Sequence, residues 1–186
     1  QLPPESVPQL SLVAAVGLHR ALSSFAPDIR LKWPNDLLHM KSKLAGILTE
    51  MRAEPGHVHA VVIGIGVNIR RPACGWPADI AQPVTDLASA AGRNIPRLEV
   101  AGKIIRALDT AYQCYLDEGL APIRKAWWQA HTACHQRVRV HDGGHYIEGI
   151  AEALDDDGAL LLRHDGELTR IIAGDLEVMD MGSDAS

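Results

Sequence analysis

The sequence has few cysteines, and they are not spaced as in a disulfide framework or a zinc site. Its 186 residues include 3 cysteines, Cys74, Cys114 and Cys134, with no CxxC pair among them. An odd number of scattered cysteines excludes the disulfide-dense secreted class and gives no zinc-ribbon signature. We therefore expect a protein of a reducing compartment, the cytoplasm.

Long apolar runs and a surplus of positive charge are also missing. No apolar stretch approaches the roughly 20 residues of a membrane helix, and the N-terminus has no basic region followed by an apolar run. The formal net charge is −5. This balance gives no electrostatic reason to expect a nucleic-acid partner for this segment, so an anionic ligand would have to be held by local cations.

The first two thirds of the chain alternate between helical and strand-like patterns. Apolar residues at helical spacing predict a helix over 11–25 with Ser11 as its N-cap, and further helices over 85–91, 98–119 and 121–132. Strands are predicted at 29–33, 44–51 and 60–65, with turns at 34–36, 40–42 and 55–56 and a loop over 70–82. Because short links join these strands, we expect an α+β fold whose antiparallel or mixed sheet is flanked by helices.

The last 50 residues have a different pattern. Turn residues separate five short β-rich runs, at 137–141, 146–153, 159–163, 168–173 and 176–179. Five short strands in so few residues predict a small SH3-like β-barrel. We place one domain at 1–133 and a second at 134–182, followed by a tail over 183–186.

Three segments of the first domain carry the candidate chemistry: Lys32–Asp36, Lys43–Leu48 and Gly64–Asn68. Lys43 precedes an apolar strand, where a lysine either meets a buried anion or keeps its ammonium in water. Gly46 weakens that strand by roughly 0.5 to 1 kcal/mol relative to alanine, which a close-lying ligand, a bulge or a tight packing contact would explain.

The remaining signals of these segments are weaker singly. The Gly64-x-Gly66 pair lacks the third glycine of a dinucleotide loop, and no Walker lysine follows it. Asn68 could bind a ligand through its amide or be a simple turn residue, and Asp36 could be catalytic or cap an Asx-turn after Pro34. A Rossmann or P-loop fold is therefore not predicted.

In this order and spacing the three segments resemble the motifs of the biotin–protein ligase family, namely KWPND, KLAGIL and GxGxN. The resemblance continues through 117–122 and 158–162, so it covers most of the chain. It implies an enzyme that joins biotin and ATP to biotinyl-5′-AMP and passes the biotinyl group to a lysine of the biotin carboxyl carrier protein of acetyl-CoA carboxylase. ATP with Mg²⁺ is then the expected cofactor, without a metal-ligating cage of side chains, and a homodimer is left open.

The resemblance also implies a role for individual residues. Lys43 would offset the charge of the two reacting anions, and Asp36 would orient or deprotonate the incoming amine. Biotin would lie against Lys43, Gly46 and Gly64. The residues implied for the nucleotide side are Lys32, Asn35, Ile47 and Asn68.

One part of the family pattern is not in this sequence. The family's Gly/Arg-rich adenylate loop would precede Ser11, so the chain resembles a ligase without the N-terminal part of its catalytic domain. We therefore expect the isolated piece to be weakly active or inactive. Arg70 and Arg71 follow the GxGxN segment, but the register of the resemblance assigns neither of them a contact with the nucleotide. The alternatives are an acyl transferase like lipoate ligase or octanoyltransferase, and a non-catalytic binding module; assaying biotin transfer distinguishes all three.

Overall fold

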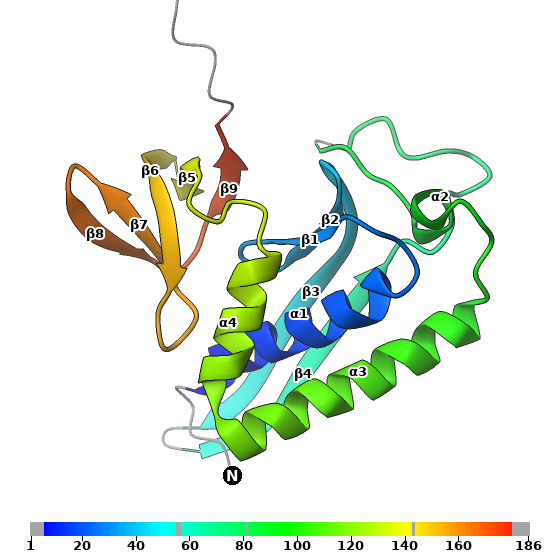
Figure 1. The fold of residues 1–186 in the computed structure, drawn as a ribbon, viewed down its shortest axis with the longest axis horizontal. Helices are drawn as coiled ribbons and strands as arrows, with labels where there is room; N and C mark the ends of the chain where they lie inside the picture. Colours follow the sequence, from blue (N-terminus) through cyan, green and yellow to red (C-terminus); the bar gives the residue numbers. More distant parts are fainter. Residues whose placement is uncertain (1–5, 55–56, 81, 143, 180–186) are drawn as a thin grey trace, which may run out of the picture.

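The computed structural model describes residues 6–54, 57–80, 82–142 and 144–179 (Figure 1). The predicted turn at 55–56, the predicted tail and the last residues of the second predicted domain lie outside the described residues. Within the described residues two antiparallel sheets follow one another along the chain, with α-helices packed against the first. The predicted α+β class is confirmed.

The first sheet has four strands in the order β1-β2-β3-β4. They are β1 (Ile29–Lys32), β2 (Asp36–His39), β3 (Ser42–Glu54) and β4 (His57–Val67). The antiparallel arrangement is confirmed, but the predicted turn at 34–36 ends sooner, because Asp36 already pairs with Lys32 and begins a strand that was not anticipated. β3 and β4 also extend past the predicted runs, since their hairpin continues to pair into polar sequence.

Helices cover one face of this sheet. In Figure 1 α1 (Val7–Ser23) crosses β3 and β4, and α3 (Arg97–Glu118) runs beside it. A Cβ at Gly17 would lie 3.0 Å from the Cα of Leu108, so this glycine lets α1 and α3 approach closely. The short α2 (Leu87–Ala91) ends at Gly92 as predicted, and α4 (Leu120–Ala130) leads to the second sheet.

The predicted N-cap of the first helix is wrong. Ser11 lies inside α1, which begins at Val7 with Pro8 in its first turn. The Ser11 hydroxyl oxygen is instead 2.7 Å from the Thr49 hydroxyl oxygen on β3. A side chain facing the sheet thus looked like a helix start, because its polar group is satisfied by a tertiary contact that the local pattern does not show.

The second sheet contains the five predicted strands in the order β8-β7-β6-β5-β9. They are β5 (Arg137–Asp142), β6 (His145–Leu154), β7 (Leu160–His164), β8 (Glu167–Ile171) and β9 (Asp175–Val178). In the described part of the chain β8 and β9 stay at the two edges, so the hydrogen-bonded sheet remains open instead of closing into a barrel. Its inward side chains, among them Val138, Leu160 and Leu176, are buried.

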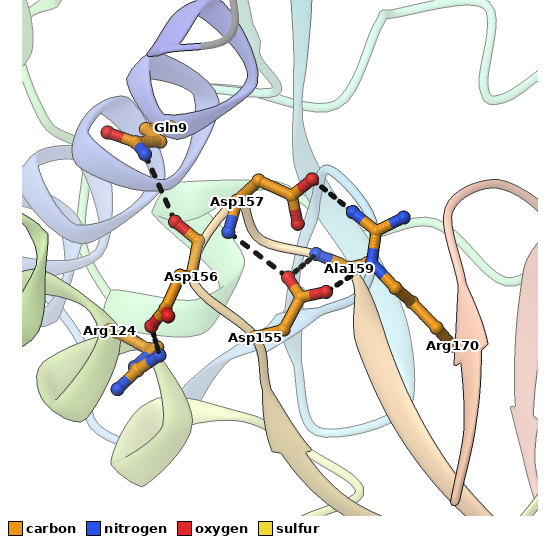
Figure 2. Close-up of polar contacts among 7 residues, drawn as sticks. All are labelled: Gln9, Arg124, Asp155, Asp156, Asp157, Ala159 and Arg170. Carbon is orange, nitrogen blue, oxygen red and sulfur yellow. Dashed lines mark hydrogen bonds and ion pairs between the residues drawn. The ribbon is translucent and has the colours of Figure 1, made fainter.

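The turn between β6 and β7 fastens the second sheet to the helices (Figure 2). Arg124 of α4 forms an ion pair with Asp156, and the Gln9 side-chain amide of α1 donates to the Asp156 carbonyl at 3.0 Å. Gly158 of this turn has φ +94°, and a Cβ there would lie 2.9 Å from Leu12 of α1. The positive φ therefore favours glycine here, and the absence of a Cβ leaves room for the Leu12 side chain.

The same turn is closed by a carboxylate. Asp155 accepts hydrogen bonds from the backbone N–H groups of Asp157 (3.1 Å) and Ala159 (2.9 Å), and Arg170 pairs with both Asp155 and Asp157 (Figure 2). Burial alone would raise the pKa of Asp155, but hydrogen bonds with Asp157, Arg170 and the backbone outweigh it and lower the pKa to about 2. The folded state therefore favours the ionised carboxyl.

Asp155→Asn should make the stability of the protein less dependent on acid. The pKa of Asp155 in the folded protein lies below the ordinary aspartate value of 3.8, so the carboxylate's contribution to stability is present above about pH 4 and lost as the pH falls toward 2. Urea unfolding between pH 7 and pH 2.5 should show a smaller loss of unfolding free energy for the variant than for the wild type. Asp109→Asn, on the exposed surface of α3, should behave like the wild type. Equal acid dependence of Asp155→Asn and the wild type would contradict this account.

Candidate functional site

The register of the first sheet brings residues of all three motifs into one row. Lys32 pairs with Asp36, Asp36 pairs with Gly46, and Gly46 pairs with Gly66. Directly opposed residues of antiparallel strands project from the same face of a sheet, so this row crosses the sheet on a single face. Three segments that are separate in the sequence thus meet at one place.

The row that contains Gly46 and Gly66 lies on the face of the sheet that is turned away from α1. Ala45 and Ile47 are buried against the helices, so the alternating residues Gly46 and Leu48 point to the opposite side. Leu48 pairs with Gly64 in the next row. The three glycines Gly46, Gly64 and Gly66, which we call the glycine floor, therefore leave a strip of bare backbone. Two exposed apolar side chains border it: Leu48 (61% exposed) and Val62 (53%).

An ion pair lies over the edge of the glycine floor. The Lys43 Nζ is 2.7 Å from the Asp36 Oδ1, and the two side chains are 32% and 13% exposed. A Cβ at Gly46 would lie 3.3 Å from that carboxylate oxygen and 3.5 Å from the lysine nitrogen. A side chain at Gly46 would therefore crowd the Asp36 carboxylate and contact Lys43, and glycine leaves room for the pair over the strand.

Backbone and amide hydrogen bonds fix the position of Lys43. Its N–H donates to the Pro83 carbonyl at 2.8 Å, and its carbonyl accepts from the Thr85 N–H at 2.9 Å. The Asn68 side-chain amide donates to the carbonyls of Thr85 (3.1 Å) and Lys43 (3.4 Å). Asn68 therefore ties the end of β4 to Lys43 and to the segment beyond it.

Asn35 and Ile47 meet at a different edge of the site. The Asn35 amide donates to the Ile47 carbonyl at 2.8 Å, and the Ile47 N–H donates to the Asn35 carbonyl at 2.9 Å. Ile47 as a whole is only 3% exposed, so this edge of the site is closely packed. Both residues line a cavity of about 340 Å³ to which the second sheet contributes Arg170. Asn68 lines a separate cavity of about 810 Å³.

Lys32 contacts the second sheet. Its Nζ is 2.7 Å from the Asp175 Oδ1 at the start of β9, and the two side chains are 16% and 79% exposed. Nothing in the sequence pointed to Asp175, which is 143 residues away. Gly66 was not predicted as a site residue either. The sequence could have indicated it, because residues two apart in a strand lie on one face, so Gly66 lies on the same face as Gly64.

The described residues include no group of three or more His, Cys, Asp and Glu side chains that could hold a metal ion. In the same part of the chain, no helix has the length and apolarity needed to cross a membrane.

The arrangement suits a ligand with a flat or apolar part and an anionic group. Bare backbone allows close approach of a ring, and Lys43 supplies a cation at the edge of that strip. A lysine held beside the site can stabilise negative charge that develops during a reaction, and a paired carboxylate such as Asp36 can accept a proton from an amine.

Two family models match parts of the chain. Residues 5–68 match the biotin/lipoate A/B protein ligase family, and residues 134–179 match the biotin protein ligase C terminal domain. The bifunctional ligase/repressor BirA of Bacillus subtilis is 34% identical over 180 residues, covering 95% of this chain and 55% of that protein. The biotin--[acetyl-CoA-carboxylase] ligase of Paracoccus denitrificans is 38% identical over 160 residues, covering 83% and 66%. The chain thus spans about half the length of the BirA relative.

A solved structure shows the same fold. The apo biotin protein ligase of Aquifex aeolicus superimposes with a TM-score of 0.79 at 22% identity, covering 95% of this chain and 76% of that one.

The tight contact at Gly46 predicts different effects of alanine at two glycines of the floor. A Cβ at Gly66 meets nothing within 4 Å, so Gly66→Ala should stabilise the fold by roughly 0.5 to 1 kcal/mol through the lower entropy of the unfolded chain. Gly46→Ala should gain less or lose stability, since its methyl presses on the Lys43–Asp36 pair. Urea unfolding of the two variants checks this, and equal stabilisation by both would show that the pair is not held tightly over Gly46.

Proposed function

The chain belongs to the biotin protein ligase family, and from this premise we propose that it activates biotin with ATP to biotinyl-5′-AMP and transfers the biotinyl group to a lysine of a carrier protein. The observation that carries the proposal is the Lys43–Asp36 ion pair over the glycine floor. It supplies a cation, a proton acceptor and a bare surface at one place.

Biotin is the ligand proposed for the glycine floor. Its bicyclic ring would lie against Gly46 and Gly64, with its carboxylate directed to Lys43. A valine or leucine at either glycine would fill this strip, whereas the exposed side chains of Leu48 and Val62 suit an apolar ring and tail.

ATP is proposed for the side of the site formed by Lys32, Asn35, Ile47 and Asn68. Asn35 and Ile47 line the cavity of about 340 Å³. The Lys32 ammonium would leave Asp175 and pair with a phosphate oxygen of ATP. Asn68 would keep Lys43 in position through its hydrogen bond to the Lys43 carbonyl. Because the described residues offer no carboxylate cage, Mg²⁺ does not fit as an ion held by these side chains and would come bound to the ATP phosphates.

The proposed reaction has two steps. An oxygen of the biotin carboxylate attacks the α-phosphorus of ATP, the bond to the bridging oxygen breaks, and pyrophosphate leaves. The amine of the carrier lysine then attacks the acyl carbon, and AMP leaves with the bonding electron pair. Lys43 would offset the repulsion between the two anions of the first step. Asp36 would orient the amine of the second step and accept its proton.

The partner and the setting follow from the same proposal. The Paracoccus relative is named for acetyl-CoA carboxylase, so the carrier proposed here is the biotin carboxyl carrier protein of that enzyme, and the compartment is the cytoplasm. We propose residues 1–133 as part of the catalytic domain and 134–182 as an accessory domain, supported by the separation of the two sheets after α4.

A transfer assay tests the function and the role of Lys43 together. The full-length protein, incubated with ATP, biotin and a carrier domain, should release pyrophosphate and give a carrier that avidin detects. Lys43→Ala should lower adenylate formation at saturating biotin by about 100-fold or more, the typical loss when one charge-stabilising donor is removed.

Lys125→Ala, on the exposed surface of α4, serves as the matched control and should keep full activity. Near-normal pyrophosphate release by Lys43→Ala would contradict the role. Lipoyl or octanoyl transfer by the wild type without biotin transfer would show that the substrate is wrong, since the N-terminal family model covers both kinds of ligase. The absence of any transfer would favour a binding module.

Asp36→Asn separates the two half-reactions. If Asp36 receives the amine proton, the variant should transfer biotin from preformed biotinyl-AMP more slowly, with a smaller effect on adenylate synthesis. Raising the pH should partly restore transfer, because more of the acceptor lysine is then neutral. Single-turnover rates of each step across pH 7 to 9.5 measure this. Equal losses in both steps would indicate that Asp36 serves only to hold Lys43.

A further inference from the structure

His131 is a buried polar residue that the proposed chemistry does not use. It follows the last residue of α4 and is only 3% exposed. Its imidazole stacks on the indoles of Trp127 and Trp128, with ring centroids 4.6 and 5.5 Å away. The ring is therefore held in place by its own helix, directly before the chain enters the second sheet.

The chain around His131 runs beside β1, on the side away from β2. Leu31 and His131 form an isolated parallel bridge, and the Thr132 N–H donates to the Leu31 carbonyl at 2.8 Å. Directly after β1, the Trp33 N–H donates to the Nε2 of His131 at 3.3 Å. A side chain thus continues a backbone ladder at the point where β1 gives way to the Lys32–Asp36 motif.

The Trp33 amide is the last backbone donor before Asn35, because Pro34 has no N–H. Two residues further, Asn35 is bonded to the backbone of Ile47, and Asp36 meets Lys43. The contact with His131 therefore fixes the start of a short segment whose other end bears the proposed catalytic carboxylate.

The imidazole can accept this hydrogen bond only while it is neutral. Burial lowers the pKa of His131 to about 3, so the ring stays neutral at physiological pH. A neutral imidazole has one accepting nitrogen, and acceptance at Nε2 requires the ring proton on Nδ1. The Ala133 N–H, 3.4 Å from Nδ1, favours the other tautomer, and the two amides therefore compete for the ring.

We propose that His131 is a positioning residue of the ligase site: its Nε2 accepts from the Trp33 amide and so holds the segment that places Asn35 against β3 and Asp36 against Lys43. This inference rests on the proposed function for its kinetic consequence, while the hydrogen bond itself can be observed independently. His131 lies outside the set of residues proposed to contact biotin, ATP or the acceptor amine. It couples the end of α4 to the catalytic pair.

Two substitutions separate the ring from its acceptor. His131→Phe keeps an aromatic ring for stacking but has no acceptor, and His131→Gln loses the ring while keeping an oxygen within reach of the Trp33 amide. Hydrogen exchange of the ¹⁵N-labelled full-length protein should show the Trp33 amide exchanging at least tenfold faster in His131→Phe than in the wild type, with protection retained in His131→Gln. In the wild type, ring ¹⁵N shifts should show the proton on Nδ1 above pH 4.

Kinetics then test the positioning. His131→Phe should lower kcat for biotin transfer by about tenfold, as expected from losing one buried hydrogen bond, with KM for biotin within twofold of the wild type. His131→Gln should stay within threefold in kcat. His19→Phe removes another partly buried histidine that is bonded to β1, at the Ile29 carbonyl, so it should lower thermal stability without changing kcat per folded molecule.

Each result decides the proposal. Unchanged kcat in folded His131→Phe, unchanged exchange at Trp33, or a tenfold loss of kcat in His131→Gln overturns it. If His131→Phe does not fold, the glutamine variant and the ring ¹⁵N shifts still decide. A wild type that transfers no biotin overturns the function and with it the kinetic role, and the exchange experiment then reports only on the hydrogen bond.

Discussion

The arrangement of the candidate site depends on one constraint: a lysine and a carboxylate must approach within hydrogen-bond distance over a strand that has no side chain between them. Lys43 and Asp36 satisfy it because Asp36 is paired with Gly46 across the β2–β3 ladder. A partly shielded cation is costly unless an anion meets it, and a Cβ at Gly46 would crowd the Asp36 carboxylate of this pair. The ladder, Asn68 and the Pro83–Thr85 backbone then hold Lys43 in that position.

The glycines show how similar sequence patterns can serve different chemistry. In a dinucleotide-binding loop, glycines let the backbone turn tightly around a phosphate at a helix N-terminus. Here Gly64 and Gly66 lie within the extended strand β4 and, together with Gly46, expose flat backbone on one face of the sheet. They alternate along their strands with apolar residues that point to the other face of the sheet, and this alternation, not a turn, is what leaves the strip bare. A flat strip accommodates a ring, and the adjacent lysine accommodates its anionic end.

Residues far apart in the sequence bring the second sheet against α4 and the motif segments. Asp175 meets Lys32, Asp156 meets Arg124 of α4, and Arg170 borders the cavity beside Asn35. The exposed pairs contribute little stability singly, since solvent screens them. These pairs instead help to orient the second sheet relative to the Lys32–Asp36 segment. His131 has the corresponding proposed role for the end of α4, through its contact with Trp33.

Local pattern in the sequence determined the helices, most strands and the three motifs, because each depends on residues only a few positions apart. Periodicity could not show that Asp36 begins a strand. The segment 36–39 is too short to carry a pattern of its own, and it becomes β2 only by pairing with β1 and β3. Periodicity also predicted Ser11 as a helix N-cap, because the hydroxyl's partner, Thr49, lies on another element and is not visible in the local pattern. Lys32 with Asp175, and Trp33 with His131, are separated by 143 and 98 residues. Such contacts exist only after the sheets and helices have packed, so tertiary structure alone decided them.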